Sequence, residues 1–124
     1  MKKLLLLLLT AIILFANEAI LKLDTKGHTG LIRDIIVTKS GDIISASDDK
    51  TIRVWGIDGR EKRKILGEIG AGSFGKIFAI ALSPDEKYLA VGGYLAKPGY
   101  GESGNIRIYN YKTGKLLKLL KSHT

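Results

Sequence analysis

The sequence predicts an all-β chain built from two similar four-stranded units, with a separate apolar segment in front of them. Short stretches rich in Ile, Val, Leu and Tyr alternate with turn-forming residues along most of the chain, which is typical of antiparallel strands. The segment Thr51–Trp55 (TIRVW) recurs as Asn105–Tyr109 (NIRIY), 54 residues later (109 − 55). Such self-similarity indicates a repeat architecture in which each repeat is one small sheet.

Each unit divides into four strands joined by turns. Gly, Asp, Asn and Ser gather between the apolar stretches, and Pro84 presets the φ angle of the turn at residues 83–86. The expected strands span residues 31–37, 43–47 and 51–55 in the first unit, whose fourth strand includes residues 64–66. In the second unit they span residues 77–82, 88–93, 105–109 and 115–120. The link between the second and third strands is longer in the second unit than in the first. When the extra residues of the second unit are subtracted from the spacing of 54, the repeat length is about 45 residues, which is typical of four-stranded repeats.

Residues 1–16 are predicted to be a signal peptide. The basic head Met1–Lys3 precedes an apolar run, Leu4–Ala16, and a polar Asn17-Glu18 pair follows, as in secretory signals. The run is shorter than the roughly 20 apolar residues of a spanning helix. An uncleaved anchor and a buried core helix remain as alternatives. We expect residues 17–124 to be exported to the periplasm or cell envelope, with membrane contact only through the signal segment during export.

Charge and cysteine content narrow the function classes. The net charge is +8, but the lysines are scattered along the chain instead of forming one stripe. Nucleic-acid binding needs a basic face, so we do not expect a nucleic-acid partner. The chain has no cysteine, which excludes a Cys nucleophile and a lipid-modified Cys within these residues. No cofactor or metal site is expected.

One stretch of the first unit resembles a repeat of the WD40 family. Gly27-His28 opens this stretch, and SASDDKTIRVW, ending at Trp55, closes it. The resemblance implies a partial β-propeller, with blade one at about residues 27–67 and blade two at about 68–120. Residues 121–124 would start a further repeat, and a strand-like segment at 19–24 would close the ring against a last blade.

The resemblance also implies a structural hydrogen-bond network in blade one. Its members would be His28, Ser45, Asp49 and Trp55. A catalytic Ser-His-Asp triad is the alternative interpretation of three of them, and the family pattern favours the structural one. Blade two departs from the pattern, because Val91, Ser103 and Tyr109 occupy the corresponding positions of Ser, Asp and Trp. Blade one also departs from it at Gly56, where the family has an Asp.

A glycine-rich segment, Gly70–Lys76, imitates a phosphate-binding loop. It fits G-x-G-x-x-G and nearly fits the P-loop pattern. However, Ile77 occupies the position of the Mg²⁺-binding Ser or Thr, and a strand is expected next where a phosphate loop needs a helix. We interpret this segment as a link between the blades.

The long links of blade two are the expected partner-binding surface. In a four-stranded meander, the link before the first strand and the link between the second and third emerge at the same end. Loops on a rigid scaffold often carry function, and aromatic and charged side chains suit interfaces. The candidates are Phe74, Tyr94, Lys97, Tyr100 and Glu102. The alternative is a tolerated insertion without a binding role.

The sequence thus predicts a non-enzymatic protein-interaction scaffold whose protein partners it does not name. Propellers have four to eight blades and need at least three stacked repeats, so we expect an N-terminal fragment of a longer chain. Self-association through open blade edges is a weaker option. The alternative function is the regulatory or targeting propeller of a larger enzyme, such as a caspase-like peptidase, whose catalytic domain is absent here.

Overall fold

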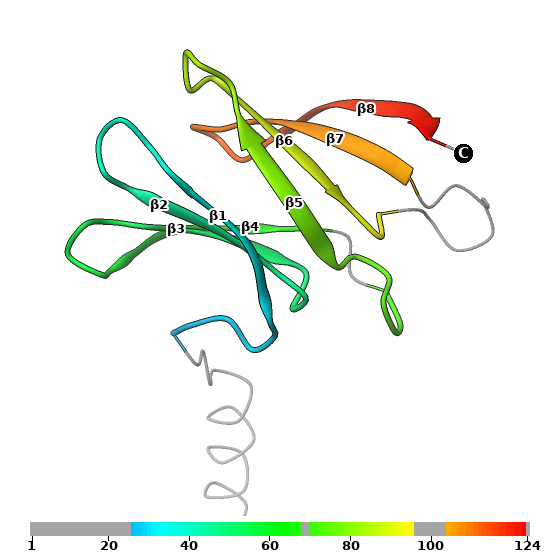
Figure 1. The fold of residues 1–124 in the computed structure, drawn as a ribbon, viewed down its shortest axis with the longest axis horizontal. Coiled ribbons are helices and arrows are strands. Elements are labelled where there is room, and N and C mark those ends of the chain that lie inside the picture. The colour runs from blue at the N-terminus through cyan, green and yellow to red at the C-terminus, as the bar shows by residue number, and fades with distance from the viewer. Residues whose placement is uncertain (1–25, 68–69, 96–103, 124) are drawn as a thin grey trace, which may run out of the picture.

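The computed structural model describes residues 26–67, 70–95 and 104–123. These residues form two antiparallel four-stranded sheets, each a simple meander (Figure 1). Blade one contains β1 (Ile32–Val37), β2 (Ile43–Ser47), β3 (Thr51–Trp55) and β4 (Glu61–Leu66). Blade two contains β5 (Ile77–Leu82), β6 (Tyr88–Gly93), β7 (Gly104–Asn110) and β8 (Leu116–His123). The predicted all-β fold is confirmed for this part of the chain.

Most strand bounds follow the sequence pattern, and the differences lie in the fourth strands. β4 begins at Glu61, where a bulge brings Glu61 opposite Trp55. β8 continues through Lys121 to His123, which pairs with Gly104. Residues expected to open a further repeat therefore extend the last strand. The predicted signal peptide (1–16) and closing strand (19–24) lie outside the described residues. Among the residues described, no helix is long and apolar enough to cross a membrane.

The core lies between the two sheets. Alternate residues of each strand point to one face of a sheet, and the face of blade one toward blade two carries Ile44, Ile52 and Val54, each at most 3% exposed. The face of blade two toward blade one contributes a second group of buried core residues. They are Ile77, Ile80, Leu89, Val91 and Tyr109. Each sheet thus buries one face against the other.

A carboxylate also joins the sheets at their first strands. Asp34 on β1 accepts a hydrogen bond from the Ile80 N–H on β5 at 2.9 Å. The second Asp34 oxygen accepts one from the Ile35 N–H, also at 2.9 Å. Because β1 and β5 are not paired as strands, this side chain satisfies a backbone donor that no ladder reaches.

The opposite face of each sheet meets solvent in part, since on blade one it also carries buried Ser45 and Arg53. On blade one this outer face includes Ile35 and Val37, which are 57% and 67% exposed, and Ile43. On blade two the outer face includes Ala81 and Leu120. Half-buried Ile106 and Ile108 lie between them in the sheet.

The connections divide between two ends of the molecule. The β1–β2, β3–β4, β5–β6 and β7–β8 turns lie at one end, toward the upper left in Figure 1. The β2–β3 turn and the link from β4 to β5 lie at the other end. We call these the turn end and the link end. Any binding surface at one end is separated from the other by the length of the strands.

Candidate functional site

Four side chains of blade one are hydrogen-bonded in a row near the link end. Trp55 Nε1–H donates to Ser45 Oγ at 2.8 Å. Ser45 Oγ lies 2.7 Å from His28 Nε2, and His28 Nδ1 lies 2.8 Å from Asp49 Oδ2. The side chains of His28 and Asp49 are only 3% and 6% exposed. Trp55 lies at the end of β3, Ser45 in the middle of β2, Asp49 in the β2–β3 turn and His28 in the segment before β1.

The directions of these bonds follow from the groups at the two ends. The indole N–H of Trp55 can only donate, so the Ser45 oxygen accepts it and its O–H is free to donate to His28 Nε2. Nε2 is then an acceptor, and Nδ1–H donates to the Asp49 carboxylate. A neutral His28 with its proton on Nδ1 therefore satisfies every partner in the row.

Asp49 ends the row and organises the β2–β3 turn. Its Oδ1 accepts hydrogen bonds from the backbone N–H of Thr51 at 3.0 Å and from the Thr51 hydroxyl at 2.6 Å. Its Oδ2 also accepts the Thr29 N–H at 3.1 Å. Burial by itself would raise the pKa of Asp49, but these donors, with His28, lower that pKa to about 2. The carboxylate is therefore charged at neutral pH and bound by four donors.

Gly30 makes room for this arrangement. A Cβ at Gly30 would lie 2.8 Å from the Asp49 backbone nitrogen, closer than real Cβ contacts permit. The chain segment that carries His28 therefore passes tightly against the Asp49 turn. No sequence feature that we used pointed to Gly30.

Blade two has no such row among its described residues. Val91 lies opposite Arg107 in the ladder, just as Ser45 lies opposite Arg53. Tyr109 lies opposite Leu89, as Trp55 lies opposite Ile43. Val91 and Tyr109 are buried at 1% and 6% exposure and belong to the core. The third position, Ser103, lies outside the described residues.

The geometry of Ser45 fits a structural role better than a nucleophilic one. Ser45 is 3% exposed, and its oxygen already accepts the Trp55 N–H. A nucleophile needs access to a substrate carbonyl and a free oxygen lone pair. Within the described ranges, no group of three or more His, Cys, Asp or Glu could hold a metal ion.

The glycine-rich segment uses its backbone N–H groups internally. Gly75 N–H donates to the Tyr94 carbonyl at 2.7 Å, and Lys76 N–H donates to the Ser73 carbonyl at 3.1 Å. Phosphate loops instead point successive N–H groups at the anion. β5 follows directly, where a phosphate-binding loop would begin a helix. In this structure the segment packs against the start of the other long link.

The predicted partner-binding residues of these links have different surroundings. Phe74 is 8% exposed, and its ring covers Gly70 so closely that a Cβ there would overlap it. Tyr94 is 44% exposed and remains available at the link end. Lys97, Tyr100 and Glu102 lie outside the described residues.

Buried Arg107 fixes the beginning of the β6–β7 link. Its Nη2 donates to the Leu95 carbonyl at 2.9 Å, and both residues are buried, at 4% and 2% exposure. Arg53 occupies the same ladder position in blade one and pairs with Glu61 at 2.5 Å. The recurrence of Arg in TIRVW and NIRIY was the available signal for this pair of buried cations.

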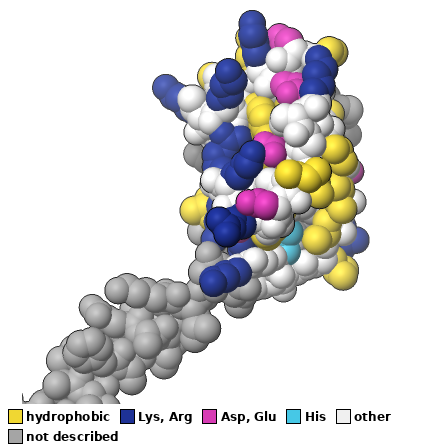
Figure 2. All heavy atoms as spheres, turned by 90° about the vertical axis from the view of Figure 1, so that its left-hand side faces the viewer, with side chains coloured by type: hydrophobic (Ala, Val, Ile, Leu, Met, Phe, Trp, Pro, Cys, Tyr) yellow, Lys and Arg dark blue, Asp and Glu magenta, His cyan; other side chains and the backbone are white. Residues whose placement is uncertain are grey.

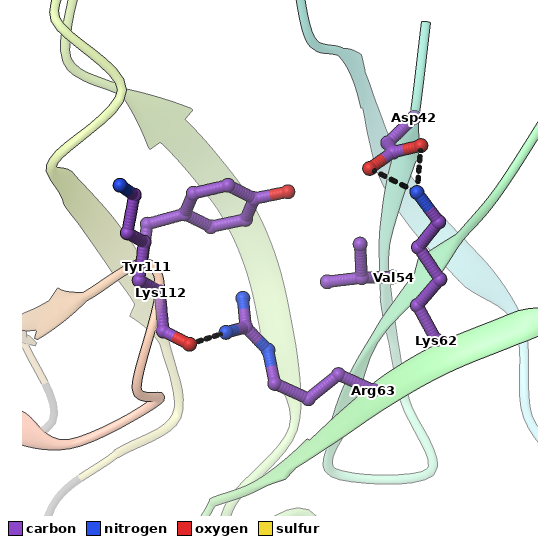
Figure 3. A pocket seen from close by; sticks show the side chains of 6 residues that line it. All are labelled: Asp42, Val54, Lys62, Arg63, Tyr111 and Lys112. Atoms are coloured by element: carbon purple, nitrogen blue, oxygen red, sulfur yellow. Dashed lines mark hydrogen bonds and ion pairs between the residues drawn. The ribbon is translucent and has the colours of Figure 1, made fainter. Parts of the chain in front are cut away.

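A second feature lies at the turn end, where the blades meet. A hollow of about 270 Å³ opens between them, and Figure 3 shows the side chains around it. Its lining residues are Asp42, Val54, Lys62, Arg63, Tyr111 and Lys112. Sequence reasoning missed this site because the residues come from four separate segments.

Figure 2 views the molecule from the side on which the blade-one turns lie. Lys and Arg side chains are spread over much of this side, while hydrophobic side chains gather in a band along one edge. A cationic surface with an adjacent apolar band offers both charge and contact area for a partner.

Comparisons with known proteins agree with this architecture. A family model described as "WD domain, G-beta repeat" matches residues 20–56 and 64–110. The WD repeat-containing protein dyf-2 of Caenorhabditis elegans is 27% identical over 124 aligned residues. The alignment covers 92% of this chain and 8% of dyf-2.

Solved structures give the same result. The crystal structure of the RRP9 WD40 repeats and the structure of U3-55K each match with a TM-score of 0.61 and 29% sequence identity. Each match covers 78% of this chain and 28% of the other, so the chain spans only part of the proteins it resembles. WD40 repeat proteins act as protein-interaction scaffolds and are generally non-enzymatic. With two matched repeats and two four-stranded blades, this chain belongs to the WD40 repeat family.

Proposed function

We propose that this chain is a non-enzymatic interaction scaffold, exported to the cell envelope, which works as part of a larger WD40 assembly. The observation that carries the proposal is the stacking of two blades on one shared core, with recognition surfaces left at both ends. The long links and the hollow are such surfaces. Protein partners are the class that fits a rigid sheet scaffold with variable loops.

The exposed outer faces support a larger assembly. Blade two covers one face of blade one. On the other face of blade one, which stays free, Ile35 and Val37 are more than half exposed. Contiguous exposed apolar surface of this kind marks an interaction site. We propose that further blades, in this chain or in another, cover it.

The N-terminal composition supports export. The basic head, the apolar run Leu4–Ala16 and the following polar pair are typical of a secretory signal. The mass and N-terminus of the native protein in an envelope fraction test both proposals. An N-terminus near residue 17 and a mass of tens of kilodaltons are expected. An intact Met1 in a cytosolic fraction would overturn export.

Site-specific photo-crosslinking tests the scaffold function. A photoreactive residue at Tyr94, exposed at the link end, is expected to capture a discrete protein partner in the native cells. The same residue at Ile57, which is 87% exposed in the β3–β4 turn, is the control and should capture less. Crosslinks that are equal and diffuse at both positions would contradict recognition through the link end.

A further inference from the structure

The hollow between the blades at the turn end carries more cationic than anionic charge. Lys62, Arg63 and Lys112 line it together with a single carboxylate, Asp42. It lies at the opposite end from the long links. No part of the proposed partner surface at Tyr94 therefore overlaps it.

The only carboxylate of the lining is already neutralised. Lys62 Nζ donates to both Asp42 oxygens, at 2.7 and 2.9 Å. These hydrogen bonds raise the pKa of Lys62, so Lys62 keeps its charge at neutral pH and stays bound to Asp42. Arg63 and Lys112 form no ion pair with any carboxylate of the described residues. Neither of these two positive charges is therefore neutralised by a direct ion pair within the described residues, although the Glu86 carboxylate also acts on Tyr111.

Two contacts hold the Arg63 guanidinium in place. It lies 4.9 Å from the centre of the Tyr111 ring, and its Nη1 donates to the Lys112 carbonyl. These two contacts position the planar group across the gap between blades. Its Nε is buried, so a ligand in the hollow would meet the Nη atoms. A guanidinium with unused donors is the preferred group for binding carboxylate or phosphate.

Tyr111 adds a neutral donor. Burial raises the pKa of Tyr111, although the charge of Arg63 opposes this effect, so the hydroxyl keeps its proton at neutral pH. Figure 3 shows the hydroxyl directed across the hollow, from blade two toward Val54 and Asp42 of blade one. Donors from both blades thus face one volume.

We propose that this hollow binds an oxyanion, carboxylate or phosphate, carried by an acidic peptide segment of a partner protein. Its volume of about 270 Å³ is below the roughly 300–1,000 Å³ of small-molecule sites, and it suits a single anionic side chain. The apolar Val54 and the Tyr111 ring provide contact for the carbon atoms of that side chain. The proposal rests on the scaffold function and adds a second recognition site to it.

The test is a titration of the ¹⁵N-labelled full chain, followed by NMR at constant ionic strength. The probes are inorganic phosphate, acetate, a Glu-rich hexapeptide, its phosphoserine-containing counterpart and its Gln-substituted counterpart. Saturable shifts are expected at the amides of Lys62, Arg63, Tyr111 and Lys112. The acidic peptides should bind more tightly than the free ions, and the Gln peptide should not bind. The two acidic peptides show which oxyanion is preferred.

Arg63→Gln is expected to weaken peptide binding about tenfold, the usual effect of losing one charge-assisted hydrogen bond. The matched control is Arg60→Gln, which removes the same charge three residues away at a side chain 88% exposed. Lys112→Gln changes an exposed side chain without disturbing the Tyr111 ring contact. Its binding should also fall, so a folding defect of Arg63→Gln would not hide the result.

Three outcomes would overturn the proposal. One is a non-saturating drift spread over all lysine-bearing strands. Another is equal weakening by Arg60→Gln and Arg63→Gln. A third is that the free ions bind as tightly as the acidic peptides, which would exclude an acidic peptide segment as the ligand. Crosslinking at Tyr94 reports the scaffold function separately, since it uses the other end of the molecule.

Discussion

The hydrogen-bonded row from Trp55 to Asp49 is complete at the level of single atoms. Each donor in it meets one acceptor, and each buried polar group has a partner. This completeness explains why the residue types are so specific. An apolar residue at one position alone would leave its neighbours buried and unpaired. In blade two, both Val91 and Tyr109 are core side chains.

Asp49→Ala is expected to destabilise the fold by about 1–3 kcal/mol, because His28 and Thr51 lose a buried acceptor. Chemical denaturation of the two proteins at pH 7 measures the difference. The control is Asp58→Ala, which removes an exposed carboxylate in a turn. Apart from the loss of its hydrogen bond from the Arg60 N–H, this change should lower stability by less than about 0.5 kcal/mol. Equal losses in both variants would argue against the row as a structural unit.

The stability that Asp49 contributes should depend on pH in a specific window. Its pKa falls from 3.8 in the unfolded chain to about 2 in the folded one, so the unfolded state binds a proton first as the pH falls. The contribution is complete above about pH 4 and is lost as the pH falls toward 2. The difference in unfolding free energy between wild type and Asp49→Asn should shrink across this window. A difference that stays constant down to pH 2 would contradict the lowered pKa.

At the scale of the strands, close backbone approaches decide how the blade-two links begin. Tyr94 N–H donates to the Lys76 carbonyl at 2.9 Å, directly after β6. Gly93 permits this contact, because a Cβ there would lie 2.2 Å from the same carbonyl oxygen. The neighbouring Gly92 has no atom within 4 Å of its Cβ position.

These two glycines form a matched pair for mutation. Gly93→Ala should lower stability by about 1–3 kcal/mol, since the β5–β6 contact must move to admit the methyl group. Gly92→Ala should change it by less than about 0.5 kcal/mol. Thermal melts of both variants test the difference. A tolerated Gly93→Ala would mean that the start of the link relaxes easily.

The stacking of two blades leaves a repeated surface on the whole molecule. Within the chain, one face of blade two packs on one face of blade one. The free face of blade one, with Ile35 and Val37, is equivalent in the ladder to the packed face of blade two. A head-to-tail contact between copies can therefore imitate the internal one.

We expect the isolated chain to self-associate with increasing concentration. Val37→Lys should reduce the average mass, because it places a charge on the free apolar face. Ile57→Lys is the control, since Ile57 is 87% exposed but lies in the β3–β4 turn, away from both faces. Analytical ultracentrifugation over a concentration series makes the measurement. A monomer at all concentrations would show that the outer faces do not attract each other.

Strands and the hydrogen-bonded row could be anticipated because their information is local or repeated. Thr51–Trp55 occupies its predicted bounds, since a segment rich in β-branched residues favours an extended strand. The resemblance to the WD40 family implied a network of His28, Ser45, Asp49 and Trp55, and the four side chains are hydrogen-bonded together. The bounds of β4 and β8 were less accessible, because a bulge and strand pairing determine them.

By itself, the sequence determined the all-β class and the two repeats and, through its resemblance to the WD40 family, the residues of the hydrogen-bonded row in blade one. Only the tertiary structure decided which surfaces are available. It buried Phe74, hydrogen-bonded Arg107 to the Leu95 carbonyl, and brought Arg63 of β4 against Tyr111 at the far end. The physical reason is that periodicity reports the environment of a residue within its own strand. Contacts between residues about 50 positions apart depend on how one sheet stacks on the next.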